Sequence, residues 1–173
     1  GDVTGATTVT ISDVGTEIDL AAGVDITASG GNVDLNNTVA QIDLSGTTDT
    51  NTISASGSVE LANVVDTGTT TATSPVELVV TAGTGVTLGT VTLSNTLDVD
   101  FDTATGTSTL NAGSLSAGTI EVDGVGTNDV MNFGSTVVST VAGVTIGNAG
   151  TVDLDGDVTG ATTVTISDVG TEI

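Results

Sequence analysis

The side chains in this sequence whose type and spacing could bind an ion are carboxylates. Two short stretches, DVDFD and DLDGD, each place three aspartates at alternate positions. Ca²⁺ takes six to eight oxygen ligands at about 2.3–2.6 Å, whereas alternate residues on one strand lie about 6.5–7 Å apart. One strand cannot surround an ion, so a neighbouring segment has to contribute. The candidate metal ligands are Asp98, Asp100, Asp102, Asp153, Asp155 and Asp157.

Neither stretch satisfies the EF-hand pattern. An EF-hand loop that began at Asp153 would need Gly at its sixth position and Glu at its twelfth, but Val158 and Val164 stand there. The aspartates therefore have two interpretations, a solvated acidic face or an ordered cation site, and the solvated face is favoured. Neither interpretation requires a cofactor, and Ca²⁺ or another divalent cation is the ion expected if one is bound.

The composition excludes most catalytic chemistry. The 173 residues include no Lys, Arg, His, Cys, Trp or Tyr, against 22 Asp and Glu, so the formal charge is −22. Without basic side chains the chain cannot clamp phosphates, which excludes nucleic-acid binding. Without His, Cys or Lys it lacks the usual general base, thiol nucleophile, zinc ligands and Schiff-base amine. We therefore expect a protein that is not an enzyme.

The elements that position these carboxylates are expected to be short β-strands. An apolar–polar–apolar pattern recurs along the whole chain, as in LDVDF at 97–101, and such alternation is typical of a strand with one buried face. Gly, Asn, Ser and Thr fill the segments between the strands, which predicts turns. Nothing in the sequence predicts a helix. In VDLDGD, residues 152–157, the pattern points Val152 and Leu154 inward and the aspartates outward.

Two architectures fit many short strands: a parallel β-helix, or β-solenoid, and a tandem array of Ig-like β-sandwiches. The β-helix is favoured because a sandwich core is usually rich in aromatic residues, and this chain has only Phe101 and Phe133. Ten Asn in turn segments add support, since stacked Asn side chains stabilise coil-on-coil packing. The strand spacing predicts coils of roughly 15–20 residues with two or three strands each, hence about eight to ten coils in a 155-residue unit.

An identical repeat defines the domain organisation. Residues 1–18 and 156–173 have the same sequence, GDVTGATTVTISDVGTEI, at a spacing of 155 residues. A shared fold alone would preserve the hydrophobic pattern but not every Thr and Ser. The repeat therefore predicts a tandem array in which residues 1–155 form one unit and residues 156–173 begin the next, each unit packing mainly on its neighbours. We expect the two identical segments to be the same coil, one unit further along the axis.

Like charges should make such an array sensitive to ions. Two carboxylates on adjacent coils, about 5 Å apart, repel by roughly 0.8 kcal/mol in water and roughly 3 kcal/mol at an effective dielectric constant of about 20. No basic side chain offsets this repulsion. The folded array is therefore expected to need divalent cations or salt for full stability.

A resemblance points to a class of protein. The VDLSG-like strands and the stretch STLNAGSLSAGTIEVDG at 108–124 resemble the β-helical repeats of large secreted bacterial surface exoproteins. The nearest group is the filamentous-haemagglutinin type of adhesin, together with other long β-strand repeat proteins. The resemblance implies a rod-like shaft on or outside the cell, and it implies no catalytic residue.

The repeat and the resemblance together predict a structural role. In this hypothesis the chain gives length and stiffness to an extracellular filament, an adhesin shaft or a biofilm matrix fibre, at the cell surface or as a secreted fibre. The alternative is a calcium-dependent adhesive or surface-layer repeat that binds ions, glycans or neighbouring chains. The expected partners are neighbouring copies of the same repeat, stacked end to end or bundled side by side, with no membrane insertion in this segment.

Overall fold

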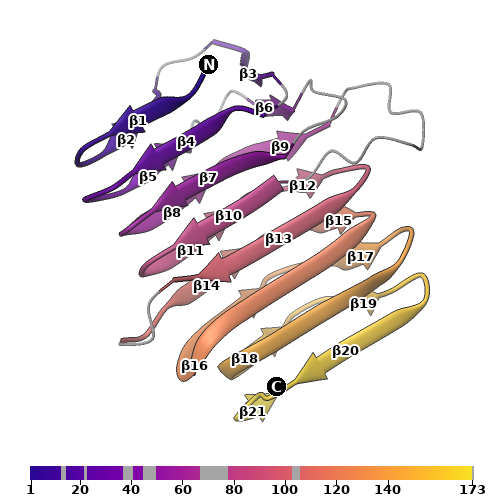
Figure 1. Ribbon diagram of the computed structural model, residues 1–173. Helices are drawn as coiled ribbons and strands as arrows, with labels where there is room; N and C mark the ends of the chain where they lie inside the picture. The colour runs from indigo at the N-terminus through magenta and orange to yellow at the C-terminus, as the bar shows by residue number, and fades with distance from the viewer. Residues whose placement is uncertain are drawn as a thin grey trace.

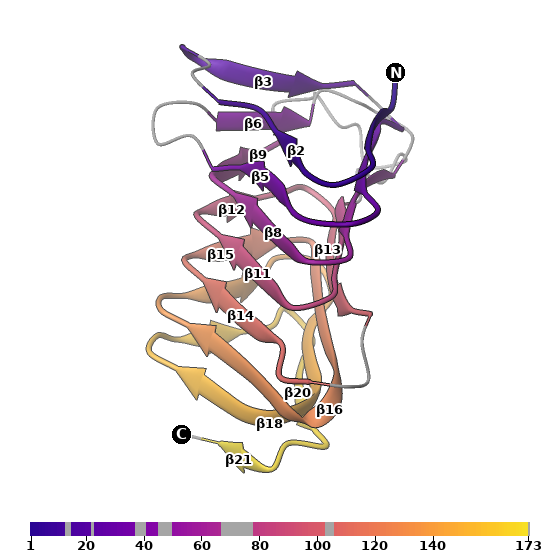
Figure 2. The same ribbon diagram turned by 90° about the vertical axis from the view of Figure 1, so that its left-hand side faces the viewer.

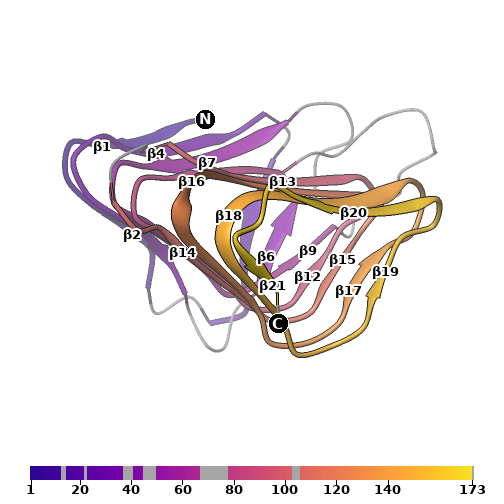
Figure 3. The same ribbon diagram turned by 90° about the horizontal axis from the view of Figure 1, so that it is seen from below.

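The computed structural model describes residues 1–12, 15–21, 23–36, 41–44, 50–66, 78–102 and 106–172. These residues form a β-solenoid without an α-helix, which coils from the N-terminus at one end to the C-terminus at the other (Figure 1). None of them belongs to a helix long and apolar enough to cross a membrane. Each complete coil has three strands, one on each of three faces, so the column is three-sided when viewed from below (Figure 3). The prediction of a β-helix is confirmed.

Each face is a stack of parallel strands, one from each coil (Figure 2). The first face contains β1 (Val3–Gly5), β4 (Asp25–Ala28), β7 (Asn51–Ala55), β10 (Leu78–Ala82), β13 (Thr96–Phe101), the first parts of β16 (Thr119–Phe133) and β18 (Gly143–Leu154), and β20 (Thr163–Ser167). The second face contains β2 (Val9–Thr10), β5 (Val33–Leu35), β8 (Ser58–Leu61), β11 (Gly85–Leu88), β14 (Thr109–Ala112), the second parts of β16 and β18, and β21 (Thr171–Glu172). The third face contains β3 (Glu17–Leu20), β6 (Gln41–Leu44), β9 (Asn63–Val65), β12 (Val91–Thr92), β15 (Leu115–Ala117), β17 (Val137–Ser139) and β19 (Val158–Thr159).

The pairing of the strands excludes the sandwich alternative. Ig-like sandwiches are built from antiparallel sheets, whereas every pair of strands in the described ranges is parallel. A parallel neighbour requires the chain to travel around the whole column before it returns to the same face. The less favoured alternative, tandem Ig-like sandwiches, is therefore excluded.

Aliphatic side chains from successive coils stack in register along the inside of the column. On the first face Ile26 lies beside Ile53, and both are fully buried. The burial pattern along β13 alternates as predicted, with buried residues separated by half-buried ones. One hydrophobic core extends along the column from Val9 to Val152. Burying each such side chain contributes on the order of 1.5–3 kcal/mol, so the core is the main source of stability.

Three larger residues lie in this aliphatic core. Phe101, Met131 and Phe133 are 3%, 0% and 1% exposed.

Val152 is also fully buried, and Leu154 is partly buried and packs against the core. The inward orientation predicted for Val152 and Leu154 is confirmed.

Glycine occupies corners where successive coils approach closely. At the corner between the second and third faces, the Gly113 N–H donates to the Leu88 carbonyl oxygen at 3.0 Å. A Cβ on Gly113 would lie 2.7 Å from the carbonyl oxygen of Gly89, which is too close for any real side chain. The coils can therefore stack at the strand spacing of about 4.8 Å because this corner has no side chain.

Most coils are longer than the predicted 15–20 residues, and the coils differ in length. Residues in register on the first face mark where one coil ends and the next begins. The shortest coil runs from Val80 to its neighbour Val99, whereas a longer one runs from Ile26 to Ile53. Three strands and three corners take more chain than predicted in most coils, and only the shortest coils, such as the one from Val80 to Val99, fall within the predicted range. The prediction of eight to ten coils per unit is also wrong, because the 155 residues of one unit make only six and two-thirds coils, from β1 in the first coil to β19 in the seventh.

The two identical segments do not occupy the same place in a coil. Residues 3–5 form β1 on the first face, whereas their repeat, residues 158–160, contributes β19 on the third face. The expectation that both would be the same coil is therefore wrong. The spacing of 155 residues carries the chain from the first face of the first coil to the third face of the seventh, which is six and two-thirds coils.

Candidate functional site

The aspartates of DVDFD lie on the first face of the column. Asp98 and Asp100 are half-buried on β13, where they alternate with inward-pointing apolar residues. In the next coil, β16 places Glu121 beside Asp98 and Asp123 beside Asp100 in parallel register. Because neighbouring strands are about 4.8 Å apart, Asp98, Asp100, Glu121 and Asp123 form a two-by-two acidic array. Glu121 and Asp123 are members that the sequence analysis did not name.

Burial and one neighbouring charge perturb the pKa of Asp100. Burial raises the pKa of the Asp100 carboxyl above its ordinary value, and the negative charge of Asp123 raises it further. The coil on the other side offers a neutral neighbour, since Thr81 lies beside Asp100. The chain has no basic side chain to offset the repulsion. A cation held between the two carboxylates would favour their charged forms and relieve this cost.

Asp102 is not part of the acidic array. It follows the last residue of β13 and is exposed, and the register with β16 ends at the pair Asp100–Asp123. The Asp102 N–H donates to the carbonyl oxygen of Ala82 at 2.9 Å, which extends the ladder of the preceding coil by one residue. The structure thus keeps two of the three candidate ligands of this stretch together.

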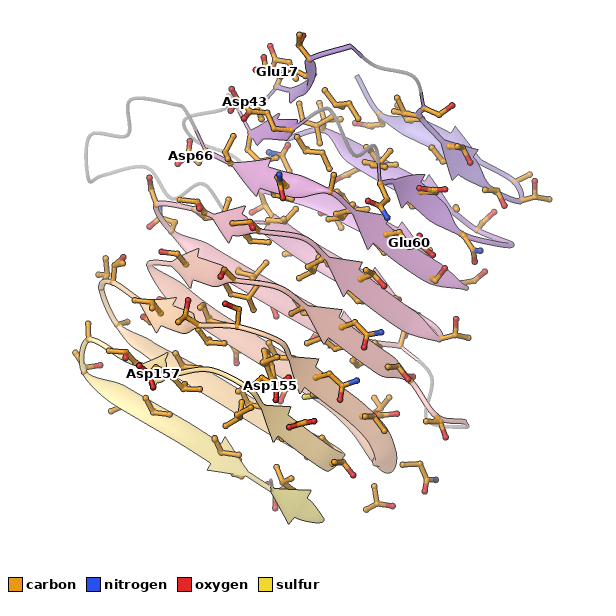
Figure 4. The ribbon with its side chains drawn as sticks, turned by 180° about the vertical axis from the view of Figure 1, so that it is seen from behind. Glu17, Asp43, Glu60, Asp66, Asp155 and Asp157 are labelled. Atoms are coloured by element: carbon orange, nitrogen blue, oxygen red, sulfur yellow. The ribbon has the colours of Figure 1, made fainter. Side chains whose placement is uncertain are left out.

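The aspartates of DLDGD lie elsewhere, on the second face and at the corner that follows it. Asp153 is on β18 beside Asn132, whose Nδ2 donates to the Oδ1 of Asn111 at 2.9 Å. Asp155 and Asp157 are exposed at the corner (Figure 4), as predicted. The structure therefore does not bring the two aspartate stretches together.

The described ranges contain no ready-made metal cage. No group of three or more of their acidic side chains is arranged to hold an ion, and no pocket opens on this part of the chain. The acidic array offers pairs of carboxylates, whereas Ca²⁺ takes six to eight oxygens. Water or a second molecule has to supply the remaining ligands of any bound ion. Cation binding by the six aspartates thus stays a prediction.

The most buried carboxylate of the described residues is one that the sequence analysis missed. Asp129 is 1% exposed. Its Oδ1 accepts from the Ser108 N–H at 2.9 Å, and its Oδ2 accepts from the N–H groups of Val125 and Gly126 at 2.8 and 3.1 Å. It lies in β16 where the register with β18 shifts, so it satisfies backbone donors that the interrupted ladder leaves open. The sequence signal was GVGTND, two glycines before an aspartate inside a strand pattern.

Asparagine side chains connect one coil to the next. The Oδ1 of Asn32 accepts from the Ser58 N–H at 2.9 Å, and the Oδ1 of Asn63 accepts from the Thr90 N–H at 3.1 Å. Together with the asparagine pair on the second face, these bonds confirm that Asn supports coil-on-coil packing. Most of this support is a side chain bonded to the backbone of the next coil, rather than a ladder of side chains.

In comparisons with known proteins, no protein-family model, no curated protein and no solved structure matches this chain. Function therefore has to be inferred from the molecule itself. Its distinctive features are a continuous core, surface ladders of acidic and amide side chains, and a sequence that begins to repeat after 155 residues. These features extend along the column and do not converge on one point.

Proposed function

We propose that this chain is a structural repeat that gives length and stiffness to an extracellular filament, an adhesin shaft or a matrix fibre. The observation that carries the proposal is the exposure of inward-facing apolar residues at both ends of the column. Val3 is 38% exposed although its neighbour in register, Ile26, is fully buried. At the other end Val164 is 45% exposed although its neighbour Val144 is fully buried. One more coil stacked on either end would bury these side chains.

At the end of residues 1–155 the start of the second copy already adds the next strands of the column. Residues 156–173 have the sequence of residues 1–18, and their first strand, β19, stacks on β17 in parallel register. In an array of such units each end is covered by the next unit, so stability grows with the number of interfaces between units. Neighbouring copies of the repeat, joined end to end, are therefore the proposed partners.

The composition supports a place outside the cell. A chain without Lys and Arg offers no cleavage site to trypsin-like proteases. The net charge of −22 also keeps separate columns apart at low salt. Both properties suit fibre material at a cell surface or in a secreted matrix.

Proteins of one, two and four consecutive units test the proposal. Particle length in electron micrographs should grow by about 32 Å per unit, because each of six and two-thirds coils adds about 4.8 Å. The stability of the folded column should also rise with the number of units. Particles that grow in all directions, or that form beads separated by gaps, would refute a continuous shaft.

A calcium-dependent adhesive or surface-layer repeat is the second candidate, and the acidic array favours it. Its paired carboxylates, with the raised pKa of Asp100, are groups whose repulsion a bridging cation relieves. Thermal unfolding in EDTA, in millimolar Ca²⁺ and in NaCl of matched ionic strength separates specific binding from general screening. Stabilisation by Ca²⁺ beyond the matched salt supports this candidate. Equal melting in all three solutions contradicts it, and it also contradicts the expected need for salt.

A further inference from the structure

We propose that successive 155-residue units are rotated by a third of a turn, so that a second copy begins on the third face of the column and not on the first. This inference rests on the array proposed above. By sequence β2 on the second face corresponds to β20 on the first, and β3 on the third corresponds to β21 on the second (Figure 3). β1 on the first face likewise corresponds to β19 on the third. Each described strand of the second copy therefore lies on the face that the chain visits just before the face of its counterpart in the first copy.

The repeated segment keeps its inward and outward sides while it changes face. Val9 lies beside the buried Val33 on the second face, and its repeat Val164 lies beside the buried Val144 on the first. The strands β1 and β19 follow the same rule, since the valine of each lies beside a fully buried residue. The outward positions of these strands are mostly Thr, which suits any strand surface. The segment can therefore occupy either face.

Chain length excludes the unrotated arrangement. On the second face Thr10 lies beside Asp34, at a level that continues coil by coil to Asp153. An unrotated second unit would put Thr165, the repeat of Thr10, beside Asp153. The chain between Asp153 and Thr165 is too short for this, because it is well below the length of even the shortest coil. The intervening residues cross the third face as β19, which leaves Thr165 on the first face beside Thr145.

The rotation changes what each side of a long column presents. Three units make about 20 coils, so the surface pattern repeats after about 96 Å and not after about 32 Å. The acidic array lies on the first face of one unit, on the third face of the next and on the second face of the one after. A column of many units therefore offers the same acidic array to cations or lateral neighbours on all three sides in turn.

Disulfide cross-linking tests the rotation, because the chain has no cysteine of its own. In a protein of two consecutive units, Thr145→Cys with Thr165→Cys places two thiols on adjacent strands if the units are rotated. Strand neighbours about 4.8 Å apart fall within the Cα separation of about 4.4–6.8 Å that a disulfide spans. The control pair, Asp153→Cys with Thr165→Cys, is adjacent only without rotation. We expect the first pair to oxidise with at least about ten times the yield of the control.

Each result decides between the two arrangements. A higher yield from the control pair, or no cross-link from either pair, overturns the rotation. Electron microscopy of the four-unit protein separates this outcome from a failure of the array. If the particles still lengthen by about 32 Å per unit, the proposal of a continuous shaft stands and only the rotation is overturned. If the particles do not lengthen, both proposals are overturned.

Discussion

Replacing Asp100 by Asn should stabilise the column at low salt. The carboxylates of Asp100 and Asp123 lie on adjacent strands in register, about 5 Å apart. Their repulsion is roughly 0.8 kcal/mol at the dielectric constant of water and roughly 3 kcal/mol at an effective dielectric constant of about 20. Asn keeps the size of the side chain, removes the charge and can donate a hydrogen bond to Asp123. We therefore expect the free energy of unfolding to rise by about 1–3 kcal/mol.

Urea and thermal unfolding, followed by far-ultraviolet circular dichroism in EDTA at low ionic strength, measure this change. For a chain of this size about 1 kcal/mol moves the melting temperature by about 2–4 °C. Asp153→Asn is the matched control, because Asp153 is also half-buried on a strand but has Asn132 as its neighbour. The control should change stability by less than about 0.5 kcal/mol, and high salt should shrink the gain from Asp100→Asn. A loss of stability, or a gain no larger than the control's, would refute the reasoning.

Acidification should stabilise the column. The pKa of Asp100 is raised in the folded state, so the stability that its protonation contributes is fully present below the pKa of Asp100 in the unfolded chain and is lost as pH rises through its pKa in the folded column. Thermal melts should show a melting temperature that falls with rising pH over this range, and Asp100→Asn should flatten that dependence. Gly113→Ala should lower the free energy of unfolding in urea by about 1–3 kcal/mol, because its Cβ meets a backbone carbonyl. The control Gly126→Ala, whose Cβ would meet no atom within 4 Å, should be nearly neutral, and equal losses would contradict the close approach of the coils at Gly113. Asp129→Ala leaves three backbone N–H groups without their acceptor and should lower the free energy of unfolding by about 2–5 kcal/mol in the same assay. A loss below about 1 kcal/mol would contradict a stabilising role for these hydrogen bonds.

Local pattern was enough to predict the solenoid, the residues that point inward and most of the short strands, whereas β16 and β18 each continue around a corner onto the next face. Alternation is a property of neighbouring residues, and a nearly aromatic-free core suits a narrow column. Coil length could not be predicted, because the corners absorb different numbers of residues, as the unequal coils that begin at Ile26 and Val80 show. The register between coils depends on that length. The pairing of Asp98 with Glu121, and the backbone hydrogen bonds that Asp129 accepts at the register shift in β16, could therefore not be predicted from the sequence alone.

The hydrogen bonds between coils run along the length of the column, since the strands of every face lie across it (Figure 1). Tension between the two ends therefore loads these bonds in series, and the coils detach one after another. Each coil that detaches shortens the folded column by about 4.8 Å but releases roughly 23 residues, which extend to about 75 Å. Such a shaft lengthens coil by coil under load, so it absorbs a sudden pull before the chain is fully extended.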